Sequence, residues 1–476
     1  MPRSGWTRLV IAAVALCAFA TLVEPVVSIG DPVSRNYNEG WNALHADTVM
    51  RGGDLYPDPG ALVFNNYPPT SFVVMGVLGA VFGDPLVAGR GVALVSLVVV
   101  ALCVGRIAAT LAACRAIGAL AVVLALALVT VFYDQYVAMN DPQLFGHALQ
   151  FLGLALFLQR PDDTRARFGS LLLLVLGGTV KHNLVAVPLA LVLWILVHRR
   201  AQASRFVLTA VALVAAGALA MFLVHGPDLY SGVLEHTRTF ALYRAANMVA
   251  AWLVPLAPVL GAALLATILG RDDPRVDVLT LVTVIGLLTG VVFAGGGGIN
   301  YNVIFDTVFA ASALAAVGVE RFVRAVRPAK GADDVVRAAA VVALSLAVLL
   351  ASPSRLAEER AELRERPGRL EAARADLAFL ERRPGPVFCS TLALAHWAGR
   401  EFEVDPFNLG QAVRTGARDD DDLVSRIVEQ EFAVIQFNDW SRRVDLTPDV
   451  LGAIEEHYRP ARTSSAHGYF FVPAGE

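Results

Sequence analysis

Charged residues are scarce in this chain. Only 17% of its 476 residues are Asp, Glu, Lys or Arg, whereas 56% are hydrophobic. A soluble protein of this size carries roughly a quarter of charged residues, so the shortage excludes an ordinary soluble core. The runs 91–105, 118–132 and 206–224 have the length and near-absence of charge of membrane helices. The sequence therefore predicts a polytopic membrane protein.

Cysteines and the common catalytic signatures are scarce as well. The four cysteines, Cys17, Cys103, Cys114 and Cys389, form no framework, so no disulfide is expected. The sequence has no zinc motif and no Ser-His-Asp signature, and the glycine run 295–298 lacks the Lys-Ser/Thr of a phosphate-binding loop. The arginines stand beside apolar runs, where membrane topology explains them, and nothing indicates nucleic-acid binding.

What the chain does have is an alternation of apolar runs with two kinds of loop. One kind is rich in arginine, and its members are 160–167, 198–205, 271–275 and 321–337. The positive-inside rule places these loops in the cytoplasm. The other kind holds few Arg or Lys but collects Glu39, Asp141, Lys181, His182 and the triplet 300–302 on the opposite face. This is the layout of an enzyme with one extracytoplasmic active site.

About eleven membrane spans are predicted, at 8–29, 88–109, 117–133, 143–159, 168–181, 183–198, 206–224, 250–270, 277–294, 303–321 and 337–352. The first is interpreted as an uncleaved helix, with a cleaved signal peptide as the alternative. Residues 70–83 are apolar but short, and as a full span they would invert the topology of everything downstream. They are predicted to form a helix at the outer interface, within a first extracytoplasmic loop over 30–87.

After Pro353 the composition changes. Residues 354–384 are charged and helix-prone, and strand-like runs follow at 387–390, 402–405, 432–437 and 468–472, with helical patterns at 423–431 and 447–457. Alternating strands and helices predict a small soluble α/β domain. The expected fold class is thus an α-helical polytopic membrane domain (1–353) with a C-terminal extracytoplasmic α/β domain (354–476).

Two acidic residues open outer segments. Glu39, just beyond the first span, is placed to act as a general base on an acceptor hydroxyl, and a solvated loop acid is the alternative. Asp141, beside Asn140 and directly before Pro142, fits a helix N-cap but also an acid at a functional site in the membrane. His147, about two turns into that helix, is expected mainly to make a polar contact within the bundle.

Lys181 interrupts an apolar stretch together with His182 and Asn183. Such a lysine is costly unless it is paired or reaches the membrane surface, and an extracytoplasmic cation suits a lipid phosphate. Arg238 and Arg244 in the outer loop 225–249 are further candidate anion ligands. The remaining candidates, for binding an acceptor or a sugar, are Asn38, Tyr67, Asn140, His147, Tyr301 and Asn302.

Several of these segments resemble the GT-C superfamily of membrane glycosyltransferases, especially the branch of protein O-mannosyltransferases and aminoarabinose transferases. The resemblance is carried by NEGWNALHADTVMRGGDLY (38–56), NNYPPTSF (65–72), Arg90, VAMNDPQLFGHALQFLGLALFLQR (137–160) and GGTVKHNLVAVPLAL (177–191). In order along the chain these supply an acid opening the first loop, G-G-x-x-Y, Pro-Pro, an Asp before a span, and a Lys after small residues.

The resemblance implies an inverting transferase that moves a sugar from a polyprenyl phosphate to an extracytoplasmic glycan, lipid or protein. It also implies that Glu39 is the base, that Asp141 assists and that Lys181 binds the carrier phosphate. Many members have an acidic pair where this chain has Asn38 and Glu39, which weakens a metal site; a divalent cation is left open and no other cofactor is implied. The alternatives are a membrane transporter and a catalytically inactive envelope-assembly or sensor protein. The expected location is a bacterial plasma membrane.

Overall fold

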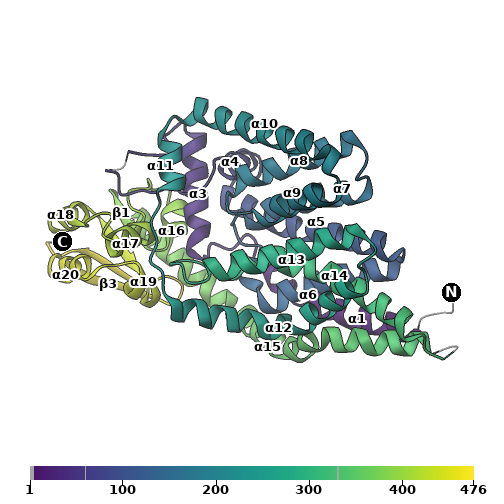
Figure 1. The fold of residues 1–476 in the computed structure, drawn as a ribbon. Helices are drawn as coiled ribbons and strands as arrows, with labels where there is room; N and C mark the ends of the chain where they lie inside the picture. The colour runs from purple at the N-terminus through teal and green to yellow at the C-terminus, as the bar shows by residue number, and fades with distance from the viewer. Residues whose placement is uncertain (1–4, 59, 330–331, 476) are drawn as a thin grey trace.

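The computed structural model describes residues 5–58, 60–329 and 332–475. A bundle of long helices makes up most of the molecule, and a small domain with a β-sheet covers one end of it (Figure 1). The first helix begins at the other end of the bundle, remote from this domain (Figure 1). The chain thus has the predicted class, a helical membrane domain followed by a small α/β domain.

Each of the eleven predicted spans is helical, in the elements α1 (Gly5–Ala20) with α2 (Val23–Val27), α5 (Pro85–Ala112), α6 (Arg115–Phe132), α7 (Gln143–Gln159), α8 (Thr164–Val180), α9 (Ala186–His198), α10 (Arg200–His225), α12 (Leu242–Ile268), α13 (Pro274–Phe293), α14 (Phe305–Val326) and α15 (Asp333–Glu381). Over the described residues, eight helical segments are long and apolar enough to cross a membrane. The helices α7, α8 and α9 are shorter, at 17, 17 and 13 residues. The number of spans therefore stays a prediction.

The centre of the bundle is α14. Its apolar window is entirely buried, whereas no residue in that of α10 is buried. Small residues let neighbours approach α14 closely: a side chain at Gly318 would clash with the backbone of Ala262 in α12. Exposed apolar side chains on α10, such as Leu208 and Leu223, are what a lipid-facing helix presents.

The first long loop carries its own helices, α3 (Tyr37–Met50) and α4 (Thr70–Phe82). Asn36 caps α3 by accepting a hydrogen bond from the Asn38 amide. The predicted interfacial helix corresponds to α4, whose 13 residues extend only about 20 Å, less than the roughly 30 Å of a bilayer core. Gly83 ends α4 in the left-handed conformation (φ 93°), and Asp84 with Pro85 begins α5.

The C-terminal part begins inside a continuous helix. α15 runs across the predicted domain boundary at residue 353, with Pro353 and Pro367 inside it. Beyond it the chain forms β1 (Val387–Cys389), α16 (Leu392–Trp397), α17 (Pro406–Arg414), α18 (Asp421–Val428), β2 (Val434–Phe437), α19 (Asp439–Val444), α20 (Pro448–His457), β3 (Tyr458–Ser464) and β4 (Gly468–Pro473). The strand order is β1-β2-β4-β3, with β1 and β2 parallel and the other pairs antiparallel.

Two details of this domain differ from the sequence-based prediction. Residues 402–405 are not a strand, because Asp405 with Pro406 caps and starts α17. The strand β3 was not predicted, since it lies at the sheet edge, contains Pro460 and is mostly exposed. A polar edge strand lacks the apolar pattern by which strands are recognised.

Candidate functional site

Polar side chains from four separate segments meet where α3, α5 and α7 begin and where α8 ends. Asn38 Nδ2 in α3 donates to Asp141 Oδ2 at 3.2 Å, and Lys181 Nζ after α8 lies 3.2 Å from Asp141 Oδ1. Asn140 donates its side-chain amide to the Glu39 carbonyl at 3.0 Å. The structure thus brings together six of the predicted site residues, with Tyr67 contacting Lys181: Asn38, Glu39, Tyr67, Asn140, Asp141 and Lys181.

Lys181 is held in place by a break between two short helices. α8 ends at Val180 and α9 begins at Ala186. The Lys181 side chain is buried, forms a salt bridge with Asp141 and lies over the Tyr67 ring, 4.7 Å from its centroid. A buried charge needs such partners, because its desolvation is otherwise uncompensated. The pair therefore places a cation and a carboxylate side by side at a polar turn within the bundle.

Asp141 also performs the local role that its sequence suggested. Its Oδ1 accepts a hydrogen bond from the Gln143 backbone amide at 2.8 Å, at the start of α7. Among the described residues, Oδ2 accepts only from the Asn38 side-chain amide, at 3.2 Å. Oδ1 is therefore held by the Gln143 amide and by Lys181, whereas Oδ2 has fewer hydrogen-bond partners among the described residues.

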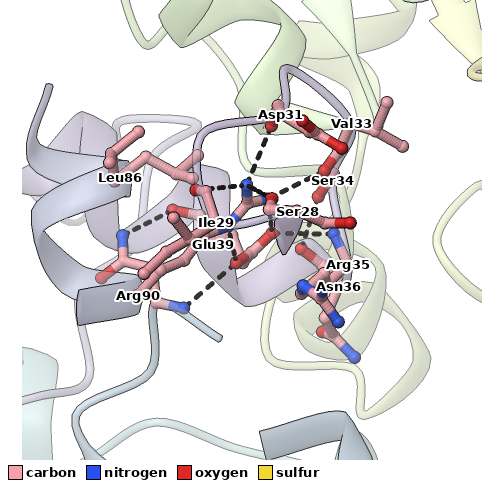
Figure 2. A network of polar contacts seen from close by, with 12 residues as sticks. Ser28, Ile29, Asp31, Val33, Ser34, Arg35, Asn36, Glu39, Leu86 and Arg90 are labelled. Atoms are coloured by element: carbon pink, nitrogen blue, oxygen red, sulfur yellow. Dashed lines mark hydrogen bonds and ion pairs between the residues drawn. The ribbon is translucent and has the colours of Figure 1, made fainter. Parts of the chain in front are cut away.

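Glu39 has a different environment. Its side chain and that of Arg90 in α5 are both 0% exposed, and they form a bidentate salt bridge with two distances of 2.7 Å (Figure 2). The remaining acceptor positions are filled by the backbone amides of Arg35 (2.7 Å to Oε2) and Asn140 (3.1 Å to Oε1). Each carboxylate oxygen of Glu39 thus accepts two hydrogen bonds.

Arg90 joins this pair to the preceding loop. Its Nη1 donates to the carbonyls of Ile29 (3.1 Å) and Asp31 (2.8 Å), and its Nη2 donates to that of Val33 (2.8 Å). Figure 2 shows the guanidinium reaching both Glu39 and this loop. A carboxylate with every acceptor position occupied and no exposure does not favour the predicted role of Glu39 as a base. The geometry instead makes Glu39 and Arg90 a clamp between α3, α5 and the loop before α3.

The predicted anion ligands divide into two groups. His182, beside Lys181, has a lowered pKa because of desolvation and the positive charges of Lys181 and Arg238, which places both cations near it. Arg238 donates to the Gly297 carbonyl at 3.0 Å, while Arg244 donates to that of Gly296 at 3.2 Å. Both arginines are thus bound to the glycine loop, and the charge of Arg238 also contributes to the lowered pKa of His182.

The other sugar-binding candidates lie behind Asp141. Asn302 exchanges side-chain and backbone hydrogen bonds with Gln143 (3.1 and 3.2 Å). His147 is fully buried, contacts the Gln143 carbonyl (2.9 Å) and lies 3.6 Å from Asp306, in agreement with a polar contact inside the bundle. Tyr301 packs against Tyr133, with ring centroids 5.7 Å apart.

The C-terminal domain contributes residues that the sequence did not single out. Asp405, before α17, accepts hydrogen bonds from the Tyr37 hydroxyl and from Trp41 Nε1 (2.9 Å), so it holds the first two turns of α3. Arg90 and Gln143 were not assigned roles either. A signal existed for Arg90, a lone charge among apolar residues of a predicted span, but its partner was not readable from the sequence.

Over residues 5–58, 60–329 and 332–475, no group of three or more His, Cys, Asp or Glu side chains is arranged to hold a metal ion. The polar atoms of the cluster around Asp141 are instead amides, one ammonium and one carboxylate. Such a set suits an anion and a hydroxyl group better than a cation.

Solved structures share this architecture. ArnT from Cupriavidus metallidurans matches with a TM-score of 0.64 at 15% identity, covering 99% of this chain and 98% of that one. An oligosaccharyltransferase from Archaeoglobus fulgidus matches with a TM-score of 0.56 at 12% identity, covering 98% of this chain and 74% of its own. No family model and no curated protein matches the sequence. The likeness shows that the chain shares the fold of these proteins, in agreement with the resemblance that its motifs carry.

Proposed function

We propose that this protein is a membrane glycosyltransferase that takes a sugar from a polyprenyl phosphate and transfers it outside the cytoplasm. The observation that carries the proposal is the buried pair of Lys181 and Asp141 at a polar turn of a GT-C fold. Among the structures sharing the fold, ArnT was solved bound to undecaprenyl phosphate, and AglB from Archaeoglobus fulgidus with an inhibitory peptide and a dolichol-phosphate. Both ligands combine an apolar chain with a phosphate.

Lys181 is the proposed phosphate ligand. Its ammonium is held by one carboxylate and one aromatic face, and a lipid phosphate competes for it with Asp141. Arg238 adds a second positive charge near the same turn. Two cations stabilise the charge that develops on the departing phosphate, which is the electrostatic contribution expected for such a leaving group.

Asp141 is the proposed base. In the reaction, an acceptor hydroxyl oxygen bonds to the anomeric carbon, the bond from that carbon to the phosphate oxygen breaks, and the hydroxyl proton passes to a carboxylate. Oδ2 of Asp141, which accepts a single long hydrogen bond, is better placed to take it than either oxygen of Glu39. Attack opposite the leaving group inverts the anomeric centre. Glu39 then positions α3, and Asn38 with it.

The test uses purified protein in lipid nanodiscs and a panel of polyprenyl monophosphates carrying different labelled sugars. Release of polyprenyl phosphate is followed for the wild type, Asp141→Asn and Lys181→Gln, with binding of polyprenyl phosphate measured separately. Asp277→Asn is the matched control, since Asp277 is a carboxylate in the first turn of α13 that pairs with His198 and lies outside the cluster around Asp141.

We expect one sugar to be transferred by the wild type and by the control. Asp141→Asn should lose about 100-fold or more in rate, the contribution of a general base, and should bind the phosphate more tightly because Lys181 has lost its competing partner. Lys181→Gln should bind it about 10-fold or more weakly. Wild-type turnover in Asp141→Asn would remove Asp141 from the base role.

A second candidate is a non-catalytic envelope-assembly or sensor protein with a retained GT-C fold. It is favoured by one observation: Glu39 is fully engaged with Arg90 and its neighbour is Asn38, so a single carboxylate remains in the cluster. Absence of release from every donor, combined with intact binding of polyprenyl phosphate, would support this function.

A further inference from the structure

A polar cavity of about 260 Å³ lies behind the loop that leads into α3. Its walls come from α2, the loop 28–35, η1 (Asp134–Tyr136) and the middle of α15. Asp31, Ser34 and Arg35, all labelled in Figure 2, lie on the wall nearest the Glu39–Arg90 clamp.

The segment from Arg35 to Asn38 connects this cavity to the proposed active site. The backbone amide of Arg35 donates to Glu39 Oε2 at 2.7 Å, and Asn36 caps α3. Two residues further, Asn38 contacts Asp141. Gln135, which also lines the cavity, accepts from Asn300 at 2.7 Å. A group bound in the cavity would therefore lie beside the segment that carries Asn38.

The charges of the lining are balanced. Four carboxylates and four guanidiniums line the cavity. Three of these acid–arginine pairs form salt bridges with nitrogen–oxygen distances of 2.7–2.8 Å. Because the formal charges cancel, the lining favours neither an anion such as a phosphate nor a cation such as an ammonium group. Val33 is the one apolar side chain in it, so it does not suit a lipid tail.

One wall residue has an unused hydrogen-bonding group. Ser28 is 6% exposed, lines the cavity, and its hydroxyl has no hydrogen-bond partner among the described residues. Buried hydroxyls are normally paired, and an unpaired one is costly unless a ligand or water satisfies it. Glu362 also lines the cavity and forms no salt bridge with any residue the structure describes. These two groups are available to a ligand without breaking a protein contact.

We propose that this cavity binds a neutral sugar unit of the acceptor, so that the acceptor is a glycan or a glycolipid headgroup; this rests on the proposed transferase function. Carboxylates accept from sugar hydroxyls, guanidiniums donate to sugar oxygens, and the hydroxyl and amide of the wall do both. The volume lies just below the roughly 300–1,000 Å³ of sites for drug-sized ligands, which fits one sugar residue and not a long chain.

Direct binding tests the proposal without any donor. The whole protein is placed in lipid nanodiscs free of maltoside detergent, and saturation-transfer NMR is recorded with methyl glycosides of neutral hexoses and pentoses. Methyl glucuronide and methyl glucosaminide serve as anionic and cationic comparators. The variants are Ser28→Ala and Glu362→Gln. The matched controls are Ser345→Ala and Glu365→Gln. Ser345 is a buried residue of α15 outside the cavity lining, and its hydroxyl has no hydrogen-bond partner among the described residues, while Glu365 is an exposed acid three residues from Glu362.

We expect at least one neutral glycoside to bind the wild type and both controls. Ser28→Ala and Glu362→Gln should weaken its binding about 3- to 10-fold, the value of one hydrogen bond, and should raise the KM for a glycan acceptor by a similar factor without changing the KM for the donor. The proposal would be overturned if no neutral glycoside bound, or if a charged comparator bound more strongly. It would also be overturned if both variants bound as the wild type does, or if they changed only the KM for the donor. Failure of transfer alone would count against the transferase function and leave the binding result standing.

Discussion

At the scale of single residues, the Glu39–Arg90 clamp is the contact on which the geometry of the site depends. Both side chains are fully buried, and Arg90 also donates to four carbonyls of the loop before α3. Loss of one partner from a buried ion pair leaves an uncompensated charge, which costs about 3–5 kcal/mol. A solvated pair at the surface contributes at most about 1 kcal/mol.

Glu39→Gln is therefore expected to lower thermal stability strongly, because Arg90 remains charged and buried. The double variant Glu39→Gln/Arg90→Gln should recover part of that loss, and Glu455→Gln, which breaks the exposed pair with Arg442, should change little. Thermal melting in lipid measures all three. The transfer activity that remains in Glu39→Gln should keep the pH profile of the wild type, since Asp141 is the proposed base.

The competing assignment makes a different forecast. If Glu39 were the base, Glu39→Gln would lose transfer entirely at every pH, while its loss of thermal stability would be the same, because Arg90 is left buried and unpaired in either case. That assignment was implied by the resemblance to the GT-C superfamily, because the position of Glu39 at the start of the first loop does not reveal that Arg90, 51 positions later, contacts both of its oxygens. Partners this distant in the chain are set by helix packing, which a single sequence does not specify.

At the scale of elements, the periodicity and composition of the sequence predicted most of the helices and the break at Lys181. The apolar runs became helices, the short run 70–83 became α4, and Lys181 marks the break between α8 and α9. The misassigned run 402–405 and the missed strand β3 lie where local apolar pattern is weak and tertiary packing decides. The docking of α16 on α3 was also not predictable: it depends on Gly40, where any side chain would clash with the backbone of Leu392 and Ala393.

The docking of α16 depends on charge as well. His396 Nδ1 lies 2.7 Å from Asp47 in α3, and its Nε2 lies 3.2 Å from Asp84 at the start of α5. Burial lowers the pKa of His396, but the hydrogen bonds and charges of Asp47 and Asp84 outweigh it and raise the pKa to about 9. A protonated imidazole thus bridges two acids on two elements of the membrane domain.

The folded-state pKa of His396 is above its unfolded value of roughly 6.5. Its stabilisation should therefore be fully present below about pH 6.5 and should be lost as the pH rises through 9, an effect of about 1–3 kcal/mol. His396→Gln should flatten the decline of melting temperature over that window, whereas His457→Gln, on a partly exposed residue of α20, should not. If the melting temperatures of the wild type and His396→Gln fell in parallel with rising pH, the charge of His396 would contribute nothing to stability.

At the scale of the whole molecule, the arginine-rich loops and the Asp141 cluster lie at opposite ends of the bundle. Contacts tie the arginine-rich loops to one another: Arg199 to Asp162 (3.2 Å), and Arg321 to Asp273 (3.8 Å). The Asp141 cluster and the docked C-terminal domain share the other end. This segregation agrees with the loop charges in the sequence, because the positive-inside rule acts on loops and needs no knowledge of packing.

Sidedness is then a prediction about the whole chain: the arginine-rich loops face the cytoplasm and the C-terminal domain lies outside. Single cysteines at Asp272, in the loop between α12 and α13, and at Glu456, at the end of α20, report the two sides, since both residues are exposed. The native Cys389 can be kept, because burial raises the pKa of its thiol to about 12 and so keeps it unreactive. The other three native cysteines are replaced by alanine. In intact bacteria a membrane-impermeant maleimide should label Glu456→Cys at once and Asp272→Cys only after permeabilisation. The reverse pattern would place the Lys181–Asp141 pair on the cytoplasmic side, where nucleotide-activated sugars are available, and the need for a lipid-linked donor would disappear.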